Sequence, residues 1–519
     1  MERAYDVVVV GSGFGGGIAA CRLAEAGKRV CVLERGKRFT GKDFEQVADI
    51  GDAPQLLWHH TLNTGGLYDV RVMRDVTVIT AAGVGGGSLI YASVQLRAPA
   101  DVFDHDWPAA ITREELDPWY TKTEDALQPN TTPDHPEELD KVRAFAAAGR
   151  HANRPANLLP LAVHFGEDRK HPFSGVEQKG CQNLGRCDIG CPINAMNRVD
   201  ITYIARAETY GADVHPLHMV TTIDPPGRDG GNWRIAYSNL GEGEDGTVEA
   251  PTVVLAAGTV GTSRLLLENR KRLPKLSPAL GTRFSGNGDA LGIAFDPQAE
   301  GTRNANNGCG PVMTSKLDFP ERNVIMANGA LPRGFDGILE IARGIKLITG
   351  WRRVLLHLRR LLGLSDEPLR PDHLKPRKRE PDADALIFLM MGRDAADGRM
   401  RLRWPFNRFD IRWDNAGSKR TFDDIQRSAE EVAEATGSEL YTAHDAGPLG
   451  TFATVHGLGG CPMADDQERG VVDDLGRVYN YPGLYVLDGS IVPTALGVNP
   501  SKTIAALAER GAASLVAEL

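Results

Sequence analysis

The sequence has few cysteines, no excess of positive charge and no long apolar run. Seven cysteines, an odd number in 519 residues, do not form a disulfide framework, so we interpret them as reduced thiols. The formal net charge of −9 argues against nucleic acid as a partner. No apolar stretch is long enough to span a bilayer, and the first residues lack the features of a signal peptide. We therefore expect a cytoplasmic protein.

Residues 7–34 have the pattern of a βαβ unit in a chain long enough for two domains. The β-branched run Val7 to Val10 predicts a buried strand, residues 18–26 predict a helix, and residues 28–34 predict the next strand. The turn between the first strand and the helix, residues 11–16, matches the G-x-G-x-x-G fingerprint of dinucleotide-binding folds. The sequence therefore predicts an α/β fold that begins with a nucleotide site.

Each part of this fingerprint has a physical role. Gly11 permits the tight turn, Gly13 lets the backbone approach a pyrophosphate, and Gly16 lets the helix pack closely on the strand. Phe14 lies within the same motif, at the helix end that faces the phosphate. Glu34 can accept hydrogen bonds from a ribose diol. The motif does not by itself separate NAD from FAD.

The C-terminal part of the chain points to a flavin. Asp488 and Gly489 end a second buried strand, where Asp488 can hold a ribityl hydroxyl. Asn499, Pro500 and Ser501 open the last helix, with Asn at the favoured N-cap and Pro at the first helical position. The positive end of that helix suits the negative charge of a reduced flavin. The two ends of the chain together predict an FAD site.

At these residues the chain resembles the glucose–methanol–choline (GMC) oxidoreductase family, and within it the cholesterol-oxidase-like branch. The resemblance extends over most of the chain. Besides residues 7–34, its motifs are residues 83–89, 255–262, 285–288, 456–461, 476–478, 488–490 and 497–500.

The resemblance implies an α/β fold, α+β overall, with two domains. One is a Rossmann-like FAD-binding domain built from discontinuous segments, and the other is a substrate domain with an antiparallel sheet. We expect the FAD domain to comprise residues 1–48, 83–100, 197–300 and 455–519. The substrate domain with its lid segments is expected from residues 49–82, 101–196 and 301–454.

The resemblance also implies that His456 and Asn499 face the reactive part of the flavin, and that Val220 meets the adenine through its backbone. Histidine suits proton transfer near neutral pH, and an Asn amide offers both a donor and an acceptor to a substrate oxygen. Asn499 could instead cap the last helix. Further cofactor contacts are expected from Gly83, Gly86, Gly87, Ser88, Ala257, Gly258 and Asn287.

We therefore expect FAD-dependent oxidation of an alcohol to the carbonyl by hydride transfer to flavin N5. The substrate class is a bulky apolar secondary alcohol such as a sterol or terpenoid, and O₂ or another acceptor reoxidises the flavin. Alternative hypotheses are an electron-transfer or ligand-binding flavoprotein, an isomerase that uses FAD structurally, and an NAD-binding module.

Three departures from the family pattern matter. Tyr91 stands where the family has an asparagine after the second glycine turn. Ala327 or Asn328 stands where cholesterol oxidases carry the glutamate that moves the steroid double bond, so isomerisation is not expected. Residues 83–92 contain no histidine that could attach FAD, which favours non-covalent binding.

Two other features have competing interpretations. Cys181, Cys187 and Cys191 are spaced more widely than the C-x₂-C pairs of metal sites, so we expect no metal but packed thiols or one local disulfide. Residues 333–379 hold 12 Lys or Arg against 5 Asp or Glu, and residues 351–362 have an apolar face opposite a basic one. This segment is a transient contact for an anionic membrane surface, a lid, or a packed helix.

Overall fold

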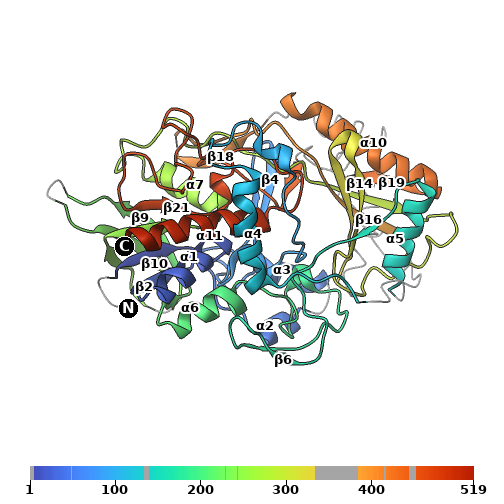
Figure 1. The fold of residues 1–519 in the computed structure, drawn as a ribbon, viewed down its shortest axis with the longest axis horizontal. Helices are drawn as coiled ribbons and strands as arrows, with labels where there is room; N and C mark the ends of the chain where they lie inside the picture. Colours follow the sequence, from blue (N-terminus) through green and yellow to red (C-terminus); the bar gives the residue numbers. More distant parts are fainter. Residues whose placement is uncertain are drawn as a thin grey trace, which may run out of the picture.

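The computed structural model describes residues 5–47, 50–133, 139–227, 230–241, 243–332, 384–405, 407–413, 416–442 and 452–519. The basic segment 333–379 lies outside the described residues. The described chain forms two lobes, each built around its own sheet, with α4 (Arg113–Leu127) running between them (Figure 1). No helix in the described part of the chain has both the length and the apolar character needed to cross a bilayer.

The first lobe contains a five-stranded parallel sheet. Its order is β21 (Leu484–Val486), β12 (Thr252–Leu255), β1 (Val7–Val10), β2 (Val30–Leu33) and β8 (Asp213–His215). Parallel sheets are covered on both faces, which is why the predicted strands are continuous apolar runs. The short run Val7–Val10 is fully buried, as the sequence predicts.

Alternate residues of β1 pack on different layers. Val7 and Val9 join the core formed with α1 (Phe14–Glu25) and α11 (Ser501–Glu518). Val8 and Val10 face the other way, against an antiparallel three-stranded sheet. That sheet comprises β9 (His218–Asp224), β10 (Trp233–Asn239) and β11 (Gly246–Ala250).

Helix α1 begins at Phe14, four residues before the predicted start. The residues in between are glycines because α1 meets other backbone segments too closely for a side chain. A Cβ on Gly15 would lie 1.5 Å from the Leu487 carbonyl oxygen, and one on Gly16 would lie 2.0 Å from that of Gly11. Gly11 itself has φ +93° and packs on Ala256, so no other residue suits this turn.

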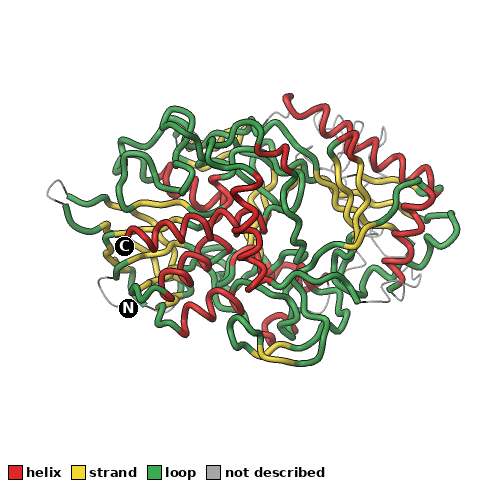
Figure 2. Tube along the Cα trace, in the orientation of Figure 1, coloured by secondary structure: helices red, strands yellow, loops and turns green. Residues whose placement is uncertain are grey.

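The second lobe is built on a six-stranded antiparallel sheet. Its order is β19 (Glu439–Thr442), β13 (Ala290–Phe295), β16 (Ala385–Met391), β15 (Val324–Asn328), β14 (Ser315–Phe319) and β5 (Asn157–Leu158). Helices α5 (Asp140–His151) and α10 (Lys419–Thr436) cover its outer face (Figure 2). The other face is also apolar and is turned toward the first lobe.

Two segments pack in the other lobe from the one that the sequence predicts for them. Strand β13 falls inside the predicted FAD segment 197–300, yet it pairs with β16 and β19 of the antiparallel sheet. Helix α4 falls inside the predicted substrate segment 101–196, yet it packs on α11, where the Tyr120 and Thr503 hydroxyls lie 2.8 Å apart. Neither pairing can be seen in local patterns, because each joins segments far apart in sequence.

Shorter elements complete the two lobes. Strands β3 (Tyr68–Val72) and β4 (Val76–Ala81) form an antiparallel pair, and β20 (Phe452–Thr454) extends it. The remaining elements are α2 (Gly41–Glu45), α3 (Ala53–Leu56), β6 (Arg169–Lys170), β7 (Glu177–Gln178), α6 (Ala205–Thr209), α7 (Gly258–Glu268), β17 (Arg399–Arg403) and β18 (Arg408–Arg412).

Candidate active site

Two glycine turns meet at the N-terminus of α1. A Cβ on Gly86 would lie 2.7 Å from the Cα of Gly13, so the two backbones touch. The buried Ser12 hydroxyl joins them, because it donates to Glu34 (2.7 Å) and accepts from the Gly85 backbone N–H (3.1 Å). The acid at the end of β2 and both turns are therefore held as one unit. Ser12 lies inside the predicted fingerprint, but only the fold reveals this role.

The surroundings of these turns fit a dinucleotide. No side chain caps the N-terminus of α1, so its backbone N–H groups keep their capacity for an anion. A Cβ on Gly13 would meet nothing closer than 3.7 Å, and one on Gly87 would meet nothing within 4 Å. Glu34 accepts from Ser12 twice and from Gly36 once, which leaves one of about four acceptor positions for a ribose hydroxyl. The backbone N–H donors at the start of α1 therefore border the open space beside Gly13 and Gly87.

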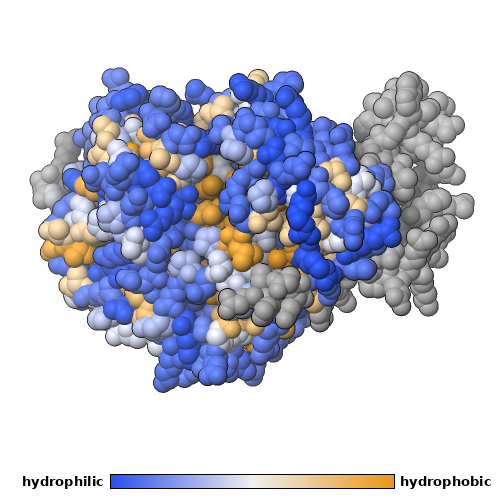
Figure 3. Space-filling model, turned by 45° about the vertical axis from the view of Figure 1, so that its right-hand side comes forward, coloured by the Kyte–Doolittle hydropathy of each residue, from blue (hydrophilic) through white to orange (hydrophobic). Residues whose placement is uncertain are grey.

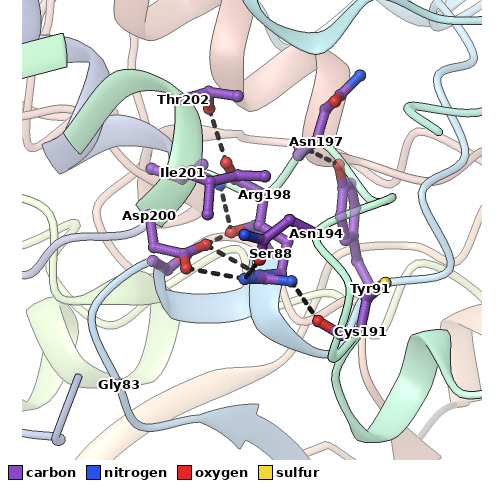
Figure 4. A network of polar contacts seen from close by, with 12 residues as sticks. Gly83, Ser88, Tyr91, Cys191, Asn194, Asn197, Arg198, Asp200, Ile201 and Thr202 are labelled. Atoms are coloured by element: carbon purple, nitrogen blue, oxygen red, sulfur yellow. Dashed lines mark hydrogen bonds and ion pairs between the residues drawn. The ribbon is translucent and has the colours of Figure 1, made fainter. Parts of the chain in front are cut away.

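A buried polar network supports the second turn from behind (Figure 4). Ser88 accepts from the Val199 backbone N–H (2.8 Å) and donates to the Gly85 carbonyl (2.7 Å). The neighbouring Arg198 forms an ion pair with Asp200 (3.0 Å). Since both charged side chains are buried, removing one would leave the other as an unpaired buried charge, which is strongly destabilising. The Ser88 hydroxyl is thus engaged within the protein, and its position supports the backbone of the turn.

Tyr91, where the family has an asparagine, is also engaged within the protein. Its hydroxyl donates to the Asn197 carbonyl (2.8 Å; Figure 4). Its ring packs edge-on against Phe14 with 5.5 Å between the ring centres. Tyr91 therefore links the first residue of α1 to the network behind the second turn.

Asp488 anchors the junction of β21 with α7. One carboxylate oxygen accepts from the Gly258 N–H (2.9 Å) and the Thr262 hydroxyl, and the other accepts from the N–H (2.9 Å) and hydroxyl of Ser490. Burial raises the pKa of this carboxyl above its usual value. All four acceptor positions are taken, so Asp488 positions the backbone of Gly258 and Gly489.

His456 and Asn499 come together from separate segments. His456 follows β20, Asn499 precedes α11, and the His456 Nε2 lies 3.4 Å from the Asn499 Nδ2. Helix α11 begins at Ser501, after Pro500, and has no side-chain cap. The Asn499 amide is therefore directed at His456 and not used as a cap. Its Oδ1 is buried and has no hydrogen-bond partner among the described residues, as expected of an acceptor that a bound group would satisfy.

One turn, residues 285–289, holds both of these side chains. Asn287 accepts from the Leu496 (2.8 Å) and Gly497 (3.0 Å) N–H groups and donates to the Val498 carbonyl (2.8 Å), which fixes the loop before Asn499. Asp289 lies 2.7 Å from the Nδ1 of His456. The sequence predicts Asn287 as a flavin contact and does not single out Asp289, because no local pattern links residue 289 to residue 456.

A second buried carboxylate supports this turn. Asp394 accepts from the Ser285 hydroxyl and the Gly288 N–H, both at 2.9 Å, and also from the Ala396 N–H. Burial raises the pKa of Asp394 to about 6, and the nearby charge of Asp289 acts in the same direction. The turn is thus fixed by hydrogen bonds on both sides.

The other predicted site residues occupy separate places. Val220 lies on β9, the edge strand of the three-stranded sheet, so part of its backbone can face a ligand. Ala257 directly precedes α7. Ala327 and Asn328 end β15, and the Asn328 amide is bound to Thr314 and Ser315.

The three clustered cysteines form no disulfide. Cys181, Cys187 and Cys191 are thiols that line a small, mostly apolar cavity together with Met196 and other residues. Neither His456 nor Asn499 lines that cavity. Among the residues that the structure describes, no group of three His, Cys, Asp or Glu side chains is arranged to hold a metal ion.

Comparison with known proteins agrees with this architecture. The cholesterol oxidase of Mycobacterium tuberculosis (strain ATCC 25618 / H37Rv) is 30% identical, over 99% of this chain and 91% of that protein. The cholesterol oxidase of Acinetobacter baumannii is 31% identical, over 98% and 93%. The solved structure of a fungal aryl-alcohol oxidase superposes with a TM-score of 0.62 over the full length of both chains, at 15% identity.

The family comparison covers both halves of the chain. Residues 14–269 match the N-terminal domain of the GMC oxidoreductases, and residues 381–508 match their C-terminal domain. These ranges include α1, the second glycine turn, His456 and Asn499. The chain therefore belongs to the glucose–methanol–choline (GMC) oxidoreductase family.

Proposed function

We propose that the protein oxidises a bulky apolar secondary alcohol, such as a sterol or terpenoid, to the carbonyl compound with FAD held non-covalently. The observation that carries this proposal is the convergence of His456 and Asn499, 3.4 Å apart, with a buried Asn499 oxygen that has no partner in the part of the chain that the structure describes. Family membership supports alcohol oxidation as the reaction class. An alcohol panel, scored by anaerobic bleaching of the flavin, tests it and separates it from a ligand-binding or electron-transfer flavoprotein.

Two side chains handle the hydroxyl of the alcohol. His456 Nε2 accepts the hydroxyl proton, and the Asn499 Nδ2 donates a hydrogen bond to the same oxygen. Bound FAD would supply the hydride acceptor at N5. Both residues are largely shielded from water, which strengthens the polar contacts they make.

The cofactor is assigned to the surface formed by the two glycine turns. Gly11, Gly13, Phe14, Gly16 and Glu34 would hold the adenosine and pyrophosphate, with Val220 beside the adenine. The flavin half is assigned to Gly83, Gly86, Gly87, Ser88, Ala257, Gly258, Asn287, Asp488, Gly489, Asn499, Pro500 and Ser501, several of them acting through the backbone they position. Residues 83–92 contain no histidine, which supports non-covalent binding.

The antiparallel sheet supports an apolar substrate. The face away from α5 and α10 carries Leu291, Ile387 and Leu389, among other apolar side chains, and Leu291 is 42% exposed. On the face shown in Figure 3, apolar residues gather along a hollow between two mostly polar halves. A small polar alcohol would gain little binding free energy from such a surface, whereas a large hydrocarbon body would gain it by removing apolar area from water. The two relatives named cholesterol oxidase support the same substrate class.

Replacing Gly13 by valine should abolish FAD binding without unfolding the protein. The backbone there (φ −71°, ψ −161°) suits any residue and the site is open, so the new side chain would occupy only the space assigned to the pyrophosphate. We expect wild type to release FAD on acid denaturation. The variant should be colourless, with the unfolding temperature of wild type stripped of FAD. A variant that retains equimolar FAD, or a wild type that binds NAD instead, would contradict the assignment.

His456→Ala should retain FAD but reduce it with alcohol more slowly by on the order of 10²-fold or more, because the proton acceptor is lost. Asn499→Ala should also slow reduction, since the substrate oxygen loses its donor. Stopped-flow absorbance under anaerobic conditions measures both rates. His105→Ala, which removes an exposed histidine, is the control. Rates equal to wild type in both site variants would place the active site elsewhere.

A 3β-hydroxy-5-ene sterol, if oxidised, should give a ketone whose double bond stays in place. Ala327 carries no carboxylate, and the Asn328 side chain is an amide, which is not a base, hydrogen-bonded to Thr314 and Ser315, so no base is available on this part of β15. Absorbance of the conjugated ketone against time measures the isomerisation. Rapid, enzyme-dependent conjugation at early times would refute this proposal.

We also propose that the protein is cytoplasmic and contacts anionic membranes peripherally through residues 333–379, where an apolar alcohol would be encountered. The support is the composition of the segment. Its arginines should contribute about 1 kcal/mol each near an anionic leaflet, so replacing four should weaken vesicle binding by on the order of 10²-fold or more.

The test is co-sedimentation with phosphatidylglycerol-containing vesicles at low salt. The test variant replaces Arg352, Arg353, Arg359 and Arg360 by Gln, and the control variant replaces Arg143, Arg150, Arg234 and Arg270. If the wild-type protein does not co-sediment with these vesicles at low salt, the membrane contact is excluded.

A further inference from the structure

We propose that Asp289 is the positioning residue of His456. It keeps the proton of the neutral ring on Nδ1, so that Nε2 faces Asn499 and the substrate hydroxyl as a bare acceptor. The role of Nε2 rests on the proposed function, whereas the position of the ring proton does not.

The contact between the two side chains defines the tautomer. The Asp289 Oδ1 lies 2.7 Å from the His456 Nδ1, a distance typical of a charge-assisted hydrogen bond. An ionised carboxylate has no proton to donate, so Nδ1 must carry one. A neutral imidazole has only one N–H, and Nε2 is therefore left with a free lone pair.

The second oxygen of Asp289 fixes the carboxylate on the same segment that carries the histidine. It accepts from the backbone N–H groups of Val455 (3.0 Å) and His456 (3.2 Å), and the Thr454 hydroxyl lies 2.9 Å away. The Asp289 side chain is only 3% exposed, so water does not compete for these bonds. The carboxylate thus has one orientation. Asp289 binds His456 at two points, the backbone N–H and the ring Nδ1.

This arrangement accounts for every proton and electron of the proposed step. Bound FAD would supply the acceptor for the hydride, which would carry away the electron pair of the alcohol's C–H bond. The O–H bond breaks and its proton moves to the His456 Nε2, and the C–O single bond becomes the carbonyl double bond. The ring then carries protons on both nitrogens, and the Asp289 carboxylate stabilises that cation.

Asp289→Asn separates a positioning role from a purely structural one. The N–H groups of Val455 and His456 require the amide oxygen, which leaves the amide NH₂ facing Nδ1. Nδ1 must then accept, and the ring proton moves to Nε2. We expect ¹⁵N NMR of holoenzyme labelled with ¹⁵N-histidine to show the Nδ1–H tautomer in wild type and the Nε2–H tautomer in the variant. The His456 signals are assigned by their loss in His456→Gln.

The kinetic effect should depend on the histidine. Asp289→Asn is expected to slow alcohol-driven flavin reduction by on the order of 10³-fold, because Nε2 can no longer accept a proton. In a His456→Ala background, the same change should slow flavin reduction by about 3-fold or less, since both substitutions remove the same proton acceptor. The matched control is Asp394→Asn, which alters the other buried carboxylate of this turn without touching His456. It should leave the tautomer on Nδ1.

Two results would overturn the inference: an Nδ1–H tautomer that persists in Asp289→Asn, or an undiminished rate loss from Asp289→Asn in the His456→Ala background. If no alcohol reduces the wild-type flavin, the proposed function fails, and the NMR measurement still decides where the ring proton lies.

Discussion

The structure depends on the direct backbone contact between α1 and the ends of the parallel strands. Gly11, Gly15 and Gly16 leave no room for a Cβ, and each touches backbone that any larger residue would displace. Glycine costs about 1 kcal/mol relative to alanine in a helix, so this stretch is helical only because tertiary packing holds it. The contact places the uncapped end of α1 against the second glycine turn, and the open space beside Gly13 follows from it.

The candidate catalytic pair is assembled in a similar way, from segments that are distant in sequence. The turn at residues 285–289 binds the segment of His456 through Asp289 and the loop of Asn499 through Asn287. Each hydrogen bond contributes about 1 kcal/mol, but a buried partner left alone would cost more than that. The two candidate catalytic side chains therefore keep their spacing although neither lies on a helix or strand.

Local patterns predict much of this fold. The strands at Val7–Val10 and Val30–Leu33 and the last helix are found where apolar runs and the residues at the helix start indicate. Long-range pairings could not be predicted. Strand β13 belongs to the antiparallel sheet because of its partners β16 and β19, and its own sequence carries no sign of that choice. In the same way, His456 and Asn499 can be named from motifs, whereas Asp289 becomes visible only when residues 289 and 456 are brought together.

Strand β13 begins one residue after Asp289, and its Leu291 lies on the apolar face of the sheet. The carboxylate that holds the histidine and the surface suited to a hydrocarbon body are thus two peptide units apart on one continuous segment. Under the proposed function, an alcohol body lying against this face would press on the same strand that follows Asp289. Selectivity would then be expressed in the rate of turnover as well as in affinity, because a poor fit would shift the carboxylate that contacts His456.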